Sequence, residues 1–204
     1  MFCCCVQESG DSVVEEVTVK TVAVLPPDHS PDFGTFTLSI PTADFLSLGL
    51  DLDVTSDTRP MIKEVRLGAV SSFNDANPTQ AIKPYDVILA LDGAESATQI
   101  SETMTRKLRD LVTIKLSRPR KHQVQLEKVG NLGMKLEYCS NSAGAVIQEV
   151  ASSGLLAKWN RSHPKDEIQP GDRILKVNGM KCAGPDMVEV IKSERKLDFT
   201  VLKY

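Results

Sequence analysis

The stretch Gln169-Pro170-Gly171-Asp172-Arg173-Ile174-Leu175-Lys176-Val177-Asn178-Gly179 combines three structural signals. Pro-Gly marks a turn, the run that follows is typical of a buried strand, and Asn-Gly is typical of a tight turn after a strand. An earlier stretch, Lys83-Pro84-Tyr85-Asp86-Val87-Ile88-Leu89-Ala90-Leu91-Asp92-Gly93, has the same order of signals. The two stretches therefore predict an internal repeat.

Further landmarks support the repeat, in the same order and at a slowly growing spacing of roughly 85 residues. They are Leu48-Gly49-Leu50 with Leu132-Gly133-Met134, Ile62-Lys63-Glu64-Val65 with Ile147-Gln148-Glu149-Val150, and Val112-Thr113-Ile114 with Phe199-Thr200-Val201. Growing spacing indicates duplication with small loop insertions. We expect one domain at 35–118, a second at 122–204, a link at 119–121, and an acidic N-terminal tail at 1–34.

Composition excludes several classes of protein. Of the 204 residues, 41% are hydrophobic and 25% are charged, which is typical of a folded globular chain. The net charge of -3 and the scattered aromatic residues argue against nucleic-acid binding. The sequence has no run of about 18 apolar residues, and its first residues lack the features of a signal peptide. We therefore expect an intracellular, cytoplasmic protein.

The five cysteines and three histidines have no spacing typical of a disulfide framework or a metal site, so no metal or other cofactor is expected. Cys3, Cys4 and Cys5 are adjacent near the N-terminus, where clustered thiols are suitable acceptors for S-palmitoylation. We expect them to anchor the protein peripherally on a membrane, although the acidic residues that follow disfavour an anionic leaflet. The alternative is a chance run of oxidation-prone thiols.

Each copy reads as strand, loop, strand, strand, short helix, two short strands, helix and strand. In the first copy, residues 35–40 alternate as a strand, and Ser96 with Gln99 forms a capping box at the start of a helix. In the second copy, Pro185 stands where the first turn of a helix tolerates proline. The fold class expected is mainly β with two short helices per domain (α+β).

The order of these elements and motifs resembles the PDZ domain family, whose members are six-stranded, partly open β-barrels with two helices. The resemblance rests on the apolar-Gly-apolar loop, the Ile-x-x-Val run after it, and the Pro-Gly-Asp-Arg-Ile-Leu-x-Val-Asn-Gly run. It implies two PDZ-like domains in tandem over most of the chain. The second copy is the better match, because Tyr85 replaces glycine and Asp92 replaces asparagine in the first.

The resemblance implies a binding site for the C-terminal tails of partner proteins. N–H groups of the glycine-containing loop would form a nest for the terminal carboxylate, and the ligand would add as a strand beside the strand after the loop. Apolar side chains would hold the terminal side chain, although each is equally typical of an ordinary core. The residues implicated are Ser47, Leu48, Gly49, Leu50 and Met104 in the first copy, and Asn131, Leu132, Gly133, Met134, Val188 and Ile191 in the second.

Charges near the two loops predict unequal sites. Lys128 precedes the second loop, at about the place where many PDZ domains keep a basic residue that assists carboxylate binding. The first loop has Asp44 before it, and Asp51 and Asp53 after it. If the apolar positions of residues 50–54 point inward, the period of two directs Asp51 and Asp53 outward, which favours basic ligands. We expect the second copy to bind free C-termini more tightly.

The function expected is that of an adaptor or scaffold for protein–protein interaction. One alternative is a membrane-associated structural or lipid-binding module whose grooves do not bind peptide, and another is a structural repeat whose grooves its own chain fills. Catalysis is not expected, because Cys139 and Cys182 have no histidine close in sequence and the tail is too short for a catalytic domain.

Overall fold

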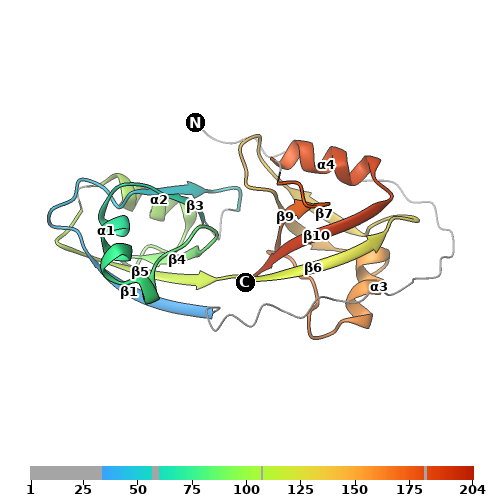
Figure 1. Cartoon of the computed structure of the whole chain (residues 1–204), viewed down its shortest axis with the longest axis horizontal. Helices are drawn as coiled ribbons and strands as arrows, with labels where there is room; N and C mark the ends of the chain where they lie inside the picture. Colours follow the sequence, from blue (N-terminus) through green and yellow to red (C-terminus); the bar gives the residue numbers. More distant parts are fainter. Residues whose placement is uncertain (1–33, 57–59, 107, 182) are drawn as a thin grey trace. The chain divides into compact units, whose positions relative to one another are not determined.

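A computed structural model describes residues 34–56, 60–106, 108–181 and 183–204. These residues form two compact units that meet in sequence between Pro119 and Arg120, here named the N-terminal unit and the C-terminal unit. Each unit contains one five-stranded sheet and two α-helices (Figure 1). No helix in the described ranges is long and apolar enough to cross a membrane.

The N-terminal unit has five antiparallel strands in the spatial order β1-β5-β4-β3-β2. Its elements are β1 (Gly34–Pro41), β2 (Leu50–Asp53), β3 (Met61–Val65), α1 (Ala69–Ala76), the 3-10 helix η1 (Pro78–Gln80), β4 (Val87–Leu91), α2 (Ala97–Thr105) and β5 (Leu111–Arg118). The predicted capping box is present, because the Gln99 N–H donates to Ser96 Oγ at 3.2 Å and the Gln99 side chain returns to the Ser96 N–H. This explains why α2 begins at Ala97.

The C-terminal unit repeats this arrangement, with the spatial order β6-β10-β9-β8-β7. Its elements are β6 (Arg120–Glu127), β7 (Met134–Glu137), β8 (Ala145–Val150), α3 (Leu155–Ser162), β9 (Arg173–Val177), α4 (Gly184–Ser193) and β10 (Lys196–Lys203). Pro185 lies in the first turn of α4, as expected, where no intrahelical bond needs its missing N–H.

The predicted fold class is confirmed, since both units are mainly β with two α-helices each. The expected number of strands is wrong: the described strands of each sheet number five, not six. The second of the two expected short strands is reduced to a single bridge, Leu91 with Ala94 in one unit and Val177 with Met180 in the other. Within the described residues neither sheet closes into a barrel, because its first two strands in sequence lie at opposite edges.

The connection between the two sheets is shorter than expected. The last strand of the N-terminal unit ends at Arg118 and the first strand of the C-terminal unit begins at Arg120, so Pro119 alone lies between them. Arg120 and Lys121, expected in the link, pair with Lys203 and Leu202 of β10.

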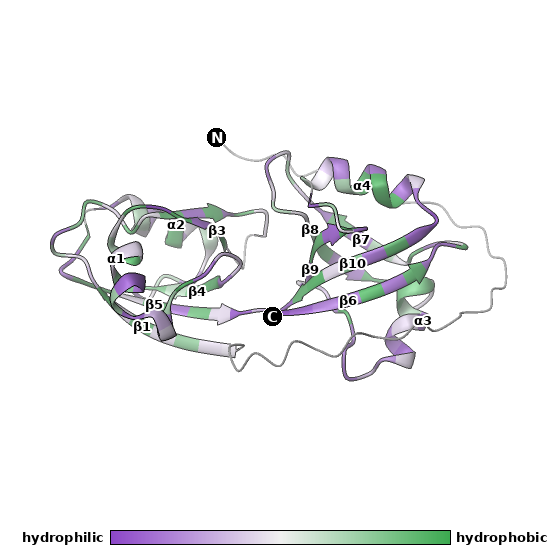
Figure 2. Cartoon of the chain, viewed as in Figure 1, coloured by the Kyte–Doolittle hydropathy of each residue, from purple (hydrophilic) through white to green (hydrophobic). Residues whose placement is uncertain are grey.

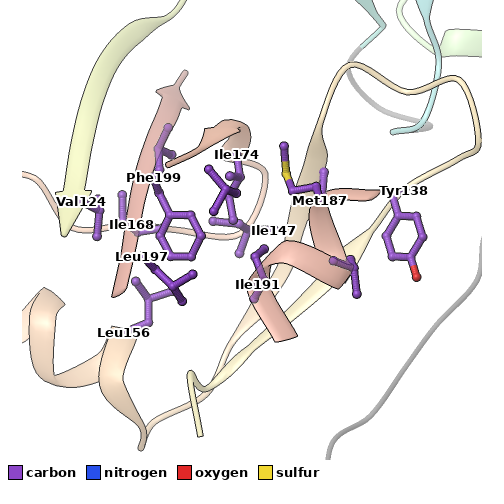
Figure 3. Close-up of a cluster of buried hydrophobic side chains, with 14 of the residues drawn as sticks. Val124, Tyr138, Ile147, Leu156, Ile168, Ile174, Met187, Ile191, Leu197 and Phe199 are labelled. Carbon is purple, nitrogen blue, oxygen red and sulfur yellow. The ribbon is translucent and has the colours of Figure 1, made fainter. Parts of the chain in front are cut away.

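Each sheet directs alternate side chains into a core on one of its faces. In β5, Val112, Ile114 and Leu116 are buried and the residues between them are exposed. Hydropathy alternates along the same strand (Figure 2). In the C-terminal unit, Phe199 of β10 lies among apolar side chains from the sheet, α3 and α4 (Figure 3). Full burial of such side chains contributes about 1.5–3 kcal/mol each.

Two turns show how the first copy keeps the fold with different residues. Tyr85 has a φ of 79°, in the left-handed region, where its counterpart Gly171 has 94°. Asp92 and Asn178 have φ values of 47° and 51°. The Oδ1 atom of Asp92 accepts an N–H of β5, and that of Asn178 accepts an N–H of β10, each at 2.8 Å. Aspartate therefore replaces asparagine without loss of this bond, whereas Tyr85 costs about 1 kcal/mol of backbone strain.

Candidate functional site

The loops that the sequence singled out are held by their main-chain carbonyls. We name residues 47–49 the first glycine loop and residues 131–133 the second glycine loop. In the second, the carbonyls of Asn131, Leu132 and Gly133 accept the N–H groups of Leu155, Leu156 and Ala151 at 3.0, 3.0 and 2.9 Å. In the first, the carbonyls of Ser47, Leu48 and Gly49 accept those of Ala69, Val70 and Arg66 at 3.1, 3.0 and 2.7 Å. In each unit the residue directly after the third strand and the first turn of the short helix thus fix the loop geometry.

Both loops require glycine at the third position. Gly49 and Gly133 have φ values of 74° and 72°, in the left-handed region. A Cβ atom on Gly49 would lie 2.6 Å from the Arg66 carbonyl oxygen, and one on Gly133 would lie 2.3 Å from the Ser153 carbonyl oxygen. Any side chain at either position would therefore push the loop away from the segment that holds it.

The strand after the second glycine loop has an open edge. β7 is the last strand of its sheet within the described residues. The bond from the Ala151 N–H to the Gly133 carbonyl makes Met134 and Val150 a non-hydrogen-bonded pair. The N–H and the carbonyl of Met134 consequently point away from β8, toward the open edge. This is the geometry that lets an extended peptide add as a further strand.

The strand after the first glycine loop repeats this geometry. β2 is the last strand of its sheet in the described part of the chain. The Arg66 N–H donates to the Gly49 carbonyl, so Leu50 and Val65 form a non-hydrogen-bonded pair. The N–H and the carbonyl of Leu50 therefore face the open edge of β2.

Apolar residues implicated by the sequence come together in each unit. In the C-terminal unit, the partly buried Leu132 and Met134 pack against the cluster that contains Val188 and Ile191 of α4. Val188 and Ile191 are 9% and 6% exposed. The open edge of β7 therefore begins at residues that share one apolar cluster with α4.

In the N-terminal unit, Leu50 and Met104 pack against a cluster that contains Leu48. Leu48 is only 2% exposed, so it is a core side chain. Met104, on α2, is partly buried against the same cluster, as Ile191 of α4 is buried in the other unit.

Lys128 directly follows β6, and its side chain reaches the C-terminal end of α4. Its Nζ donates to the carbonyl of Ile191 at 2.8 Å and also to that of Lys192, and its main-chain N–H donates to the carbonyl of Arg195 at 2.6 Å. A cation at this position caps the negative end of the helix dipole. Lysine has three donors, so one remains for a ligand after the two carbonyls are satisfied.

The expectation that Asp51 and Asp53 both face outward is wrong for Asp53. A bulge between Asp51 and Leu52 breaks the period of two, so Asp53 is buried and Val54 is 44% exposed. Asp53 Oδ1 accepts the Thr55 N–H at 2.9 Å and thereby stabilises the turn after β2.

Asp51 does remain partly exposed, but it has a cationic partner. Arg66 Nη2 lies 2.7 Å from Asp51 Oδ2, and Arg66 Nε lies 3.0 Å from Glu64 Oε2. These two carboxylates raise the pKa of the Arg66 guanidinium. The negative charge of Asp51, which we expected to attract a basic ligand, is therefore largely compensated by Arg66 of the same unit.

The sequence analysis missed a pair of asparagines that hold the segment after each short helix. Asn160 Nδ2 donates to the Ile168 carbonyl at 2.8 Å, and its Oδ1 accepts the Ile168 N–H at 3.0 Å. Asn74 makes the same two bonds to Ile82, each at 2.8 Å. The signal was present in the sequence as an Asn–Ile pair with equal spacing in both copies.

Cys3, Cys4 and Cys5 lie outside the described residues. Cys139 is buried, and its N–H lies 3.3 Å from the Ser142 hydroxyl oxygen. Among the described residues, no group of three or more His, Cys, Asp or Glu side chains could hold a metal ion.

Comparison with known proteins gave no match to a family model and none to a curated protein. Two solved structures are similar. A complex of INAD PDZ45 with NORPA CC-PBM is 18% identical, has a TM-score of 0.36, and matches over 83% of this chain and 91% of that chain. INAD PDZ45 in complex with an NG2 peptide is 16% identical, has a TM-score of 0.35, and matches over 91% and 95%. We base the proposed function on the geometry of this chain's own two units.

Proposed function

We propose that this protein is an adaptor or scaffold that binds the C-terminal tails of partner proteins by β-strand addition. One observation carries the proposal: at the start of β7, the Met134 N–H and carbonyl face an open sheet edge directly after a loop whose three carbonyls are held from behind. In this loop the Gly133 N–H donates to Asn131 Oδ1 at 2.9 Å, so a ligand carboxylate would replace this side chain as the acceptor, and the open edge supplies the pairing for the ligand residues before the carboxylate.

The second glycine loop is the stronger site in this proposal. Lys128 places an ammonium group at the end of α4, next to residues of the apolar cluster that Leu132 joins. In the first copy the residue directly after the first strand is Thr42, which carries no charge, and Asp44, an exposed carboxylate two residues further on, repels a terminal carboxylate. Removing the Lys128 charge should therefore weaken peptide binding at the second loop only.

A titration of the full chain with matched peptides tests the proposal. The probe is the tightest binder from a library of peptides ending in Val, Leu, Ile or Phe, with the C-terminus either free or amidated. The amide signals of Gly49 and Gly133 in a ¹⁵N NMR spectrum report the two loops separately. We expect the Gly133 signal to shift first with the free peptide and to respond much less to the amide. Equal responses to both forms would contradict carboxylate recognition.

The N-terminal cysteines extend the proposal to a membrane surface. Acylation of two or more of Cys3, Cys4 and Cys5 would anchor the adaptor stably, because one acyl chain binds a bilayer only reversibly. We expect the wild-type protein from cells to fractionate with membranes, and the variant in which serine replaces all three cysteines to remain in the soluble fraction. If the triple variant has the same distribution as the wild type, the membrane anchor is refuted and the peptide-binding proposal is unaffected.

A further inference from the structure

One buried histidine of the C-terminal unit has an unsatisfied ring nitrogen. His122, on β6 opposite Val201 of β10, is 5% exposed. Its buried Nε2 atom has no hydrogen-bond partner among the described residues. Its Nδ1 atom is 3.8 Å from Asp166 Oδ1, which is too far for a hydrogen bond.

The ring of His122 contacts α3 through the chain's single tryptophan. Trp159 meets His122 edge to face, with ring centroids 5.6 Å apart. The Trp159 ring also stacks on His163 at 4.2 Å and an interplanar angle of 10°. His163 Nδ1 lies 2.9 Å from the Trp159 carbonyl oxygen and 3.0 Å from Ser162 Oγ. The end of α3 and the turn after it therefore form one packed aromatic group over β6.

The other end of α3 holds the second glycine loop. The N–H groups of Leu155 and Leu156, in the first turn of α3, donate to the carbonyls of Asn131 and Leu132. Trp159 lies one turn further along the same helix. A helix moves as a unit over so short a length, so displacement of Trp159 would also disturb the loop.

Protonation of His122 is unfavourable in this packing. Burial lowers the pKa of His122 below the ordinary value of 6.5; Asp166 raises it, and Lys203, His163 and Arg120 lower it further. A histidine whose pKa is lowered by folding contributes stability above pH 6.5, and this stability is lost as the pH falls below that value. Acid therefore favours conformations in which α3 moves and water reaches the imidazolium.

The N-terminal unit shows that the fold does not need this histidine. Phe36 pairs with Leu116 where His122 pairs with Val201, and Phe36 packs partly buried against the core. The residue before Asn74 is Phe73, in the place of Trp159 before Asn160, and it packs against the core. The first copy thus has an apolar pair where the second has a titratable one.

We propose that His122 makes peptide binding at the second glycine loop sensitive to pH: bound tails are retained at neutral pH and released on acidification, through α3. The inference rests on the proposed function, because it concerns regulation of the same site. The first glycine loop, whose unit has Phe36 and Phe73 in place of His122 and Trp159, should not respond.

The experiment uses the full chain and two independent measurements between pH 8 and 5.5. Fluorescence of Trp159, the single tryptophan, follows the state of α3 without any ligand. The free-carboxylate peptide probe, whose terminal carboxylate stays ionised in this range, follows affinity through the Gly133 and Gly49 amide signals. The test variant is His122→Leu, which replaces the titratable ring by an apolar side chain, and the control is His163→Gln, which keeps His122.

For the wild type and His163→Gln, we expect the dissociation constant at the second loop to rise as the pH falls below 6.5, by at most about tenfold per pH unit for one linked proton. Trp159 fluorescence should change over the same range. For His122→Leu, both changes should disappear. The inference is overturned if His122→Leu keeps the pH dependence of Trp159 fluorescence or affinity, or if His163→Gln removes it.

Failure of the proposed function would look different. If no peptide shifts the Gly133 signal at any pH, strand addition is refuted, and the ligand-free Trp159 titration still tests the coupling from His122 to α3. If peptide binds at all pH values with constant affinity, adaptor function stands and the pH sensitivity is refuted.

Discussion

Replacing Gly133 by alanine should damage the second glycine loop far more than a matched change elsewhere in the same unit. Both Gly133 and Gly179 have left-handed φ values, 72° and 77°. A Cβ on Gly133 would meet the Ser153 carbonyl oxygen at 2.3 Å, whereas a Cβ on Gly179 would meet nothing within 4 Å. The left-handed conformation costs each alanine about 1 kcal/mol. The clash adds roughly 1–3 kcal/mol to Gly133→Ala alone.

Urea unfolding of the full chain measures this difference. Trp159 lies in the C-terminal unit, so its fluorescence reports the free energy of unfolding of that unit. We expect a loss of about 2–4 kcal/mol for Gly133→Ala and about 1 kcal/mol for Gly179→Ala. Because the clash moves the loop away from α3, Gly133→Ala should also lower the affinity for the free-carboxylate peptide at least about tenfold. Gly179→Ala should leave this affinity unchanged. Equal losses in the two variants would refute the role assigned to loop geometry.

Three further substitutions test particular contacts. Tyr85→Gly should stabilise the N-terminal unit by about 1 kcal/mol in urea unfolding, because it removes strain at a φ of 79°; destabilisation would show that side-chain contacts of Tyr85 outweigh the strain. Asn160→Leu should cost about 2–4 kcal/mol, because it leaves the N–H and carbonyl of Ile168 unpaired; hydrogen exchange at Ile168 should then accelerate, and unchanged protection would count against the assignment. Lys128→Ala should weaken peptide binding at Gly133 by about 1 kcal/mol with no effect at Gly49, and an equal effect at both loops would contradict a local role.

Positions with a local physical requirement were predictable from the sequence. The repeat, the mainly β fold, the capping box at Ser96 and the glycines at 49 and 133 follow from turn chemistry and periodicity, which act between neighbours in sequence. The outward direction of Asp53 was predicted wrongly, because a bulge after Asp51 resets the alternation and no residue type at that point announces it.

Contacts between segments far apart in the chain could not be predicted from the sequence. Lys128 reaches the end of α4, more than sixty residues away, and spacing alone did not place it there. His122 was dismissed as a metal ligand, and its burial beside Trp159 depends on the pairing of β6 with β10. The Asn160–Ile168 contact could have been predicted, because the first copy has the same pair at the same spacing. It was missed because the copies were aligned on their apolar residues alone.

The open edges of β2 and β7 also bear on the tendency of this protein to associate with itself. An unpaired strand edge attracts other strands, including those of a second copy, and can seed aggregation. Both strands are only four residues long. Lys135 and Glu137 place charges on β7, whereas on β2 Asp53 is buried and Asp51 is paired with Arg66. The shortness of both strands and the charges on β7 limit pairing with unrelated strands, and the loop before each strand favours only a chain that ends there. The same features of β7 would then limit self-association and select ligands. Replacing Lys135 and Glu137 by valine should therefore lower the solubility of the protein and its selectivity for peptides that end at the loop.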